Sequence, residues 1–104
     1  MFFQNMNNLP IEFLKIAQIE LDETFVYYEN IQNDLGYRFI NEVKESISLI
    51  QNYPNAWHNL STRTKRCLVK NFPYGVIYQI RQNRILIVAI ANLHRKPNYW
   101  KNRI

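Results

Sequence analysis

Residues 85–91, with the sequence ILIVAIA, decide the fold, because every one of them is apolar. A strand with one face in solvent alternates apolar and polar residues, whereas a strand that is covered on both faces is apolar throughout. Isoleucine and valine also favour an extended backbone. We expect this stretch to be the most buried strand of a small antiparallel sheet.

Two further strands are predicted just before it. In KRCLVKNF, residues 65–72, the side chains of Cys67 and Val69 fall on one face of an extended chain, and the charged side chains fall largely on the other. GVIYQI, residues 75–80, is the second strand, and the RQN that follows it can turn the chain into the apolar stretch. The second half of the chain therefore predicts three strands.

The first half of the chain predicts a short strand and then a helical hairpin. Residues 9–16 can supply the strand, and residues 17–32 and 37–53 each repeat apolar side chains at the spacing of one helix face until Pro54 ends the pattern. Gly36 lies in the break between the helices, where we expect a backbone conformation that other residues resist. Two helices joined so tightly should lie antiparallel.

The resulting order of elements is β-α-α-β-β-β. This order belongs to the α+β class, with the helix hairpin packed on one face of the small antiparallel sheet. A length of 104 residues suits one hydrophobic core. We predict a single domain over residues 1–104, in which residues 1–9 form a disordered extension.

Cysteine content and hydropathy indicate a compartment. Cys67 is the single cysteine, so we expect no internal disulfide and no cysteine-rich zinc site. The opening MFFQNMNNLP turns polar too early for a signal peptide, and no apolar run reaches the roughly 20 residues that span a bilayer. We expect a cytoplasmic protein that does not act at a membrane.

The charges are divided sharply between the two parts of the chain. All eight carboxylates lie within the first 45 residues, which carry a net charge of −5, and the remaining 59 residues carry a net charge of +10 with no acid at all. A segment with so many uncompensated cations indicates an anionic partner, which is either a nucleic acid or an acidic protein segment.

Several reaction classes are disfavoured by the residues of the basic half. Mg²⁺ is held by clustered carboxylate oxygens, and no carboxylate follows Glu45. Gly36 and Gly75 are the only glycines, so no glycine-rich phosphate loop is possible. We expect neither a metal nor a cofactor. The basic half remains compatible with metal-free RNA cleavage, because this reaction needs only groups that move protons and cations that stabilise a crowded phosphate.

Residues for such chemistry are concentrated in the basic half. The candidate catalytic residues are Arg66, His94 and Tyr99. The candidate residues for binding a nucleic acid or another target are Lys65, Lys70, Arg81, Arg95, Lys96 and Arg103. Purely structural roles stay open, since His94 can serve a loop and Trp100 can fold back onto the core.

An ordered set of short motifs resembles the RelE/ParE toxin superfamily. The set covers nearly the whole chain from about residue 10: AxxEL at 17–21, YYE at 27–29, LGxxFxxEV at 35–43, YP at 53–54, FPYxxxY at 72–78 and HRxPxYWxxR at 94–103. The last two motifs are similar to those of ParE-like plasmid-stabilisation proteins. The arginine-rich segment of the RelE pattern is matched only in part, by Arg66 and Lys70.

The resemblance implies the toxin of a type II toxin–antitoxin module, with a cognate antitoxin as its partner. In the RelE branch such a toxin cleaves ribosome-bound messenger RNA without a metal, and in the ParE branch it poisons DNA gyrase and is not a nuclease. Growth inhibition through translation or through gyrase is therefore expected, and the branch decides whether the protein is an enzyme. The alternative is a non-catalytic basic domain that retains antitoxin or nucleic-acid binding.

Overall fold

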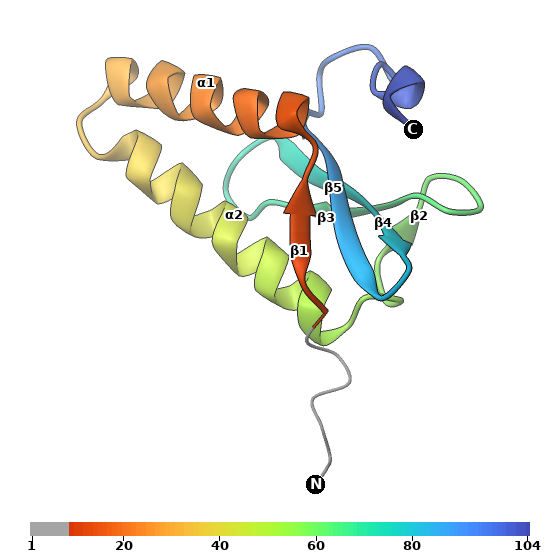
Figure 1. Cartoon of the computed structure of the whole chain (residues 1–104). Coiled ribbons are helices and arrows are strands. Elements are labelled where there is room, and N and C mark those ends of the chain that lie inside the picture. The colour runs from red at the N-terminus through yellow and green to blue at the C-terminus, as the bar shows by residue number, and fades with distance from the viewer. Residues whose placement is uncertain (1–8) are drawn as a thin grey trace, which may run out of the picture.

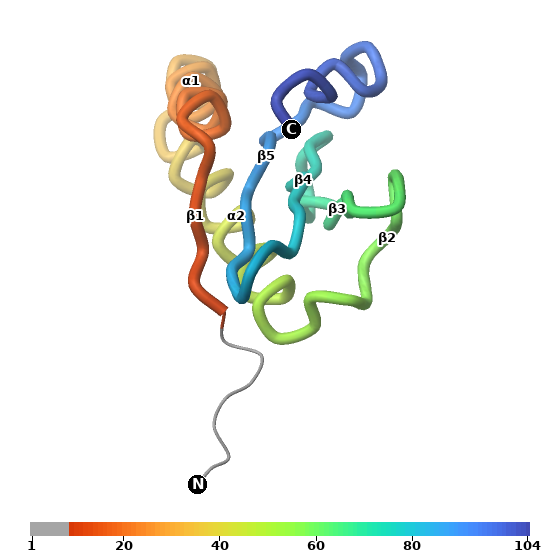
Figure 2. The backbone as a smooth tube through the Cα atoms, turned by 45° about the vertical axis from the view of Figure 1, so that its right-hand side comes forward, coloured from red at the N-terminus to blue at the C-terminus, as the bar shows by residue number. Residues whose placement is uncertain are grey.

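Two helices, five strands and a C-terminal segment form three layers in the computed structural model, which describes residues 9–104 (Figures 1 and 2). The helices cover one face of the sheet, and the C-terminal segment lies over the other. The elements are β1 (Ile11–Phe13), α1 (Lys15–Ile31), α2 (Leu35–Asn52), β2 (His58–Asn59), β3 (Lys65–Leu68), β4 (Tyr74–Arg81), β5 (Arg84–Asn92) and the 3₁₀ turn η1 (Lys101–Arg103). The α+β class with a helix hairpin on one sheet face is confirmed.

The sheet has the strand order β1-β5-β4-β3-β2. All neighbouring strands are antiparallel except β1, which runs parallel to β5 with Ile11 beside Ile85. The sheet is therefore mixed, not wholly antiparallel. A hairpin turn forces consecutive strands to be antiparallel, but β1 and β5 are joined through the rest of the fold and are free of that constraint.

The edge strand β2 was not expected, because the second half of the chain predicts only the three strands within residues 65–91. His58 pairs with Arg66, and Asn59 pairs with Lys65. Only two exposed residues are involved, so neither an apolar alternation nor a β-branched run marks the strand in the sequence. The expected extension of residues 1–9 lies outside the described residues, except for Leu9.

The turn between the helices differs from the prediction for Gly36. Asp34 holds the left-handed conformation there, with φ of 73°, and Gly36 lies inside the first turn of α2 with an ordinary backbone. Gly36 is needed for space, because a Cβ on it would lie 2.6 Å from the carbonyl oxygen of Phe25 on α1. The glycine therefore sets how closely the two helices approach.

The main core lies between the helices and the sheet. The whole stretch 85–91 is buried, which confirms β5 as the most buried strand. Phe39 of α2 is fully buried, and its ring lies 5.2 Å from that of Phe72 and 5.1 Å from that of Tyr74, both edge to face. Cys67 also points into this core, as the alternation in its strand predicts.

A second, smaller core lies on the opposite face of the sheet. Trp100 of the C-terminal segment is 4% exposed and packs with Ile77, Leu86 and Val88. This packing confirms that Trp100 folds back onto the sheet, and it fixes the C-terminal segment above β4 and β5.

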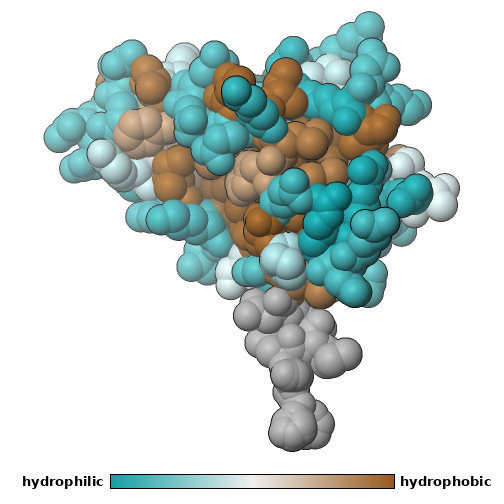
Figure 3. All heavy atoms as spheres, viewed as in Figure 1, coloured by the Kyte–Doolittle hydropathy of each residue, from teal (hydrophilic) through white to brown (hydrophobic). Residues whose placement is uncertain are grey.

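The surface seen in Figure 3 has apolar side chains gathered at its centre, around β1 and the adjoining part of α1, with hydrophilic side chains around them. Ile16 and Ile19 of α1 are 46% and 42% exposed. Across residues 9–104, neither helix is long and apolar enough to span a bilayer.

Candidate functional site

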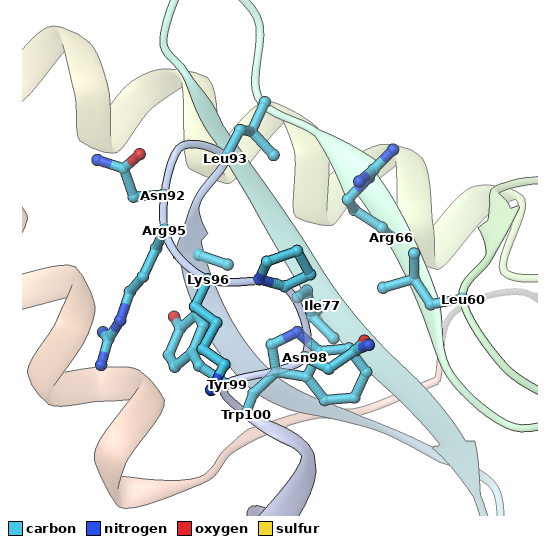
Figure 4. Close-up of a pocket in the computed structure, with 12 residues that line it drawn as sticks. Leu60, Arg66, Ile77, Asn92, Leu93, Arg95, Lys96, Asn98, Tyr99 and Trp100 are labelled. Atoms are coloured by element: carbon cyan, nitrogen blue, oxygen red, sulfur yellow. The ribbon is translucent and has the colours of Figure 1, made fainter.

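A small cleft opens between the sheet and the C-terminal segment, and three cations line it (Figure 4). Its volume is about 150 Å³. Arg66 enters from β3, whereas Arg95 and Lys96 belong to the loop after β5, and the floor includes Ile77 and Trp100. We call this the basic cleft.

Arg66 is held on the strand side of the basic cleft by its own stem. It lies on the face of β3 opposite Cys67, and a Cβ on Gly75 would come within 2.9 Å of its Cγ and Cδ. Gly75 thus leaves room for the arginine stem to lie flat across β4. The Nε atom of Arg66 is buried and has no hydrogen-bond partner among the described residues. A buried donor without an acceptor is costly, so this guanidinium is well suited to an anionic ligand.

Glu20 of α1 organises the C-terminal segment beside the basic cleft. Its carboxylate accepts hydrogen bonds from the Tyr99 hydroxyl at 2.8 Å and from both terminal nitrogens of Arg103 at 2.8 and 2.9 Å. It also accepts the backbone N–H of Ile90 at 3.0 Å, while Arg103 donates to the carbonyl oxygen of Val88. Glu20 and Arg103 therefore bond to the backbone of β5 just beyond Ile87, where the pairing of β5 with β1 ends.

The same cluster positions Arg95. The guanidinium carbon of Arg95 lies 3.7 Å from the centre of the Tyr99 ring, and its nearest nitrogen lies 3.8 Å from the Glu20 carboxylate. A cation over an aromatic face is attracted by the ring quadrupole. Arg95 is therefore stacked at the border of the basic cleft although its side chain is more than half exposed.

The Tyr99 hydroxyl is poorly suited to move a proton. Burial, and then its hydrogen bond to the Glu20 carboxylate, raise the pKa of Tyr99 above the ordinary 10.0. A general base or acid works best when its pKa is close to the ambient pH. In this arrangement Tyr99 keeps its proton and serves as a donor to Glu20 and as a platform for Arg95.

Stability should fall at alkaline pH because of this tyrosine. The folded protein keeps the Tyr99 proton while the unfolded chain loses it above about pH 10, so the free energy of unfolding decreases as the pH rises from there. Tyr99→Phe should be less stable than the wild type by about 1.5 kcal/mol near neutral pH, since it lacks the bond to a charged group. The gap should narrow as the pH rises above about 10. Urea unfolding at a series of pH values measures it.

The matched control is Tyr27→Phe, because Tyr27 is 58% exposed. That variant should follow the wild type at every pH. Burial also raises the pKa of Tyr78. Because Tyr78 is present in all three proteins, it lowers the free energy of unfolding of each by the same amount at high pH. A constant gap between Tyr99→Phe and the wild type would contradict the role given to the hydroxyl.

His94 does not line the basic cleft. It is exposed, and its backbone N–H donates to the Asn92 side chain at 2.8 Å. Asn92 therefore caps the turn in which His94 stands, and the imidazole is directed to neither Arg66 nor Tyr99 by any hydrogen bond within residues 9–104.

The remaining candidate cations are dispersed. Lys65 of β3 donates to the side chain of Asn59 on the neighbouring strand β2 at 2.6 Å. Lys70 is exposed in the turn after β3. Arg103 is bound to Glu20, and Arg81 lines a separate cleft near the end of β4. The structure thus brings together Arg66, Arg95, Lys96 and Tyr99 from the sequence-based set.

Glu20 was missed by reasoning from the sequence alone. A signal for it exists, because Glu20 lies three residues after Ala17 and four before Thr24, both of which are buried. An acid at this spacing shares the inward side of the helix and needs a cationic partner. The identity of that partner could not be predicted, since Arg103 is 83 positions away.

Comparisons with known proteins agree with this architecture. A sequence model described as the ParE toxin of type II toxin–antitoxin systems, parDE, matches residues 11–99. The structure is similar to a solved chain described as the chromosomal ParDE TA system from P. aeruginosa, with a TM-score of 0.73, 12% sequence identity, and coverage of 85% of this chain and 99% of that chain. At this identity the likeness shows a shared fold. No curated protein matches the sequence.

Proposed function

Because the chain belongs to the ParE toxin family of type II toxin–antitoxin systems, we propose that it arrests bacterial growth by binding DNA gyrase through the basic cleft, not by cleaving messenger RNA. Its partner in the cell is the cognate antitoxin of such a system. The resemblance to the ParE-like members found in the sequence motifs favours the same target.

The observation that carries the choice between gyrase and RNA is the engagement of Tyr99 by Glu20. RNA cleavage needs one group to accept a proton and another to donate one at the same phosphate. The Tyr99 hydroxyl is bound to the Glu20 carboxylate, the pKa of Tyr99 is raised, and His94 stands outside the basic cleft. Arg66 therefore has no acid–base pair beside it, and this arrangement supports binding over catalysis.

In this proposal Arg66 and Lys96 make the main contacts with the target. No described carboxylate forms an ion pair with either residue, so their charge is available to an anion. Arg95 contributes less charge because it shares Glu20 with Arg103. Lys65, Lys70 and Arg103 are proposed to support the fold and the general positive field.

Expression of the wild type without its antitoxin should arrest growth, and co-expression of the cognate antitoxin should restore it. Arg66→Gln should bind the target about tenfold more weakly, because it loses a charge-assisted contact, and should arrest growth much less. Gyrase-linked DNA breaks and messenger-RNA cleavage are measured in the same cultures. We expect breaks without message cleavage.

Arg38→Gln is the matched control, because Arg38 is exposed on α2 and its loss changes the net charge equally. This variant should stay fully toxic. Message cleavage that disappears in Arg66→Gln would instead establish the ribonuclease mechanism. A folded, well-expressed wild type without any effect on growth would favour the alternative of a non-catalytic domain that only binds an antitoxin or nucleic acid.

A further inference from the structure

A second, larger cleft lies next to the basic cleft on the same side of the sheet. Its volume is about 440 Å³, and its cations are Arg63, Arg81 and Lys101. Trp100 and Asn98 line both clefts and so separate them. We call it the second cleft. Together the two clefts present six cations on one face.

Arg81 is held in place by a buried chain of hydrogen bonds. Its Nε donates to the Gln79 side-chain oxygen at 2.7 Å, and the Gln79 amide donates to the Thr64 hydroxyl at 2.9 Å. Gln79 and Thr64 are only 4% and 1% exposed. Burial of two polar side chains at the base of a cleft is costly unless they bond to one another, and here that bonding fixes the angle of an arginine.

The anchoring leaves the outer half of the guanidinium available. Both terminal nitrogens of Arg81 are without a hydrogen bond or ion pair to any residue in 9–104. Such a pair of parallel N–H groups matches two oxygens of a phosphate. Arg63 and Lys101 are exposed at the rim and add charge without competing for the same position.

We propose that the second cleft binds the phosphodiester backbone of a nucleic acid. The ligand is favoured over an acidic protein segment because the parallel N–H groups of Arg81 stand beside the charges of Arg63 and Lys101, and a nucleic-acid strand supplies phosphates at regular intervals to such a group of cations. The amide of Asn98, which also lines the second cleft, suits sugar and phosphate oxygens, which take most protein–nucleic acid hydrogen bonds.

This site goes beyond the binding of gyrase and does not depend on it. The basic cleft and the second cleft are separate, so DNA held in the second would lie beside whatever occupies the first. A toxin that acts on an enzyme already bound to DNA would gain affinity from both contacts. The following binding test uses no gyrase and no cells, so its failure and the failure of the proposed target are distinguishable.

The test measures the fluorescence anisotropy of three labelled probes of equal length: single-stranded DNA, duplex DNA and single-stranded RNA. The purified full chain is compared with the double variant Arg63→Gln/Arg81→Gln and with Arg38→Gln/Lys44→Gln, which removes two exposed charges from α2. The first variant should bind at least tenfold more weakly and show a salt slope lower by about 1.4 on a single strand. The control should bind within about twofold of the wild type.

Arg81→Lys tests the fork itself, because it keeps the charge but removes the bond to Gln79. We expect binding about threefold to fivefold weaker, with the thermal midpoint measured alongside to show that the variant is folded. The probe that binds most tightly identifies the nucleic acid. Equal losses in both double variants, or polyglutamate that binds as tightly as the probes and is weakened by the same substitutions, would overturn the proposal.

Discussion

Replacing Glu20 by glutamine is expected to lower the free energy of unfolding by about 3 kcal/mol, because it removes one partner of a buried ion pair. The side chains of Glu20 and Arg103 are 12% and 13% exposed, so their charges are largely removed from water. Glutamine leaves the Arg103 guanidinium without its counter-charge and turns an amide donor toward other donors. Urea unfolding followed by circular dichroism measures the loss.

The control is Glu23→Gln, since Glu23 is exposed on the same helix, less than one turn away, and forms no ion pair with any residue in 9–104. Its effect should stay within about 0.5 kcal/mol. A cycle with Arg103→Gln and the double variant should give a coupling energy above about 1 kcal/mol. If Glu20→Gln costs no more than Glu23→Gln, the cluster does not hold the C-terminal segment.

Glu20→Gln should also weaken toxicity, although Glu20 does not line the basic cleft. The carboxylate holds Tyr99, Tyr99 holds Arg95, and the loop that carries Lys96 follows directly. Loss of the anchor therefore releases one wall of the cleft. Growth arrest by the variant should be compared at a temperature well below its unfolding midpoint.

Phe39→Ala is expected to cost about 4 kcal/mol, which is the range for deleting a fully buried phenylalanine. Phe39 has no exposed surface, and its ring contacts Tyr28, Phe72 and Tyr74. Three neighbouring aromatic rings cannot all move to fill the resulting cavity. Thermal and urea unfolding should both show a loss of this size.

Tyr37→Ala provides the comparison, because Tyr37 precedes Phe39 by two residues on α2 and is 59% exposed. Its one aromatic contact within residues 9–104, with Phe25 at 4.9 Å between ring centres, predicts a loss of only about 1 kcal/mol. Equal losses for the two variants would mean that the aromatic cluster is not the centre of the main core.

Most of the fold could be predicted because it rests on local patterns. The apolar run 85–91 and the helical repeats of the first half identify the central strand and the hairpin within a few residues. The parallel pairing of β1 and the existence of β2 could not be predicted, because both depend on which strand happens to lie alongside. The need for glycine at position 36 also could not be predicted, because it arises from the close approach of the two helices at Phe25.

The functional face was predictable in kind but not in arrangement. A basic half without acids indicated a binding surface, and Arg66, Arg95 and Lys96 do lie together. The order of the strands in the sheet and the exact position of the returning C-terminal segment decide which cations share a cleft, and neither follows from local sequence patterns. Arg81 belongs to a different cleft for this reason. Tyr99 looked chemically versatile until its partner Glu20 was located.

The pairing of β1 with β5 has a consequence for the synthesis of the protein on the ribosome. Ile11 cannot pair until Ile85 has been synthesised, and Glu20 cannot form its ion pair until Arg103 has been synthesised. Such separations slow folding and prevent the early part of a nascent chain from completing the core. Arg66 leaves the ribosome well before the loop that carries Arg95 and Lys96, so the basic cleft cannot form during most of elongation. A ribosome that stalls before the last strand therefore holds a chain without the basic cleft, which forms only once residues 95–103 have left the ribosome, and under the proposed function such a chain does not bind its target.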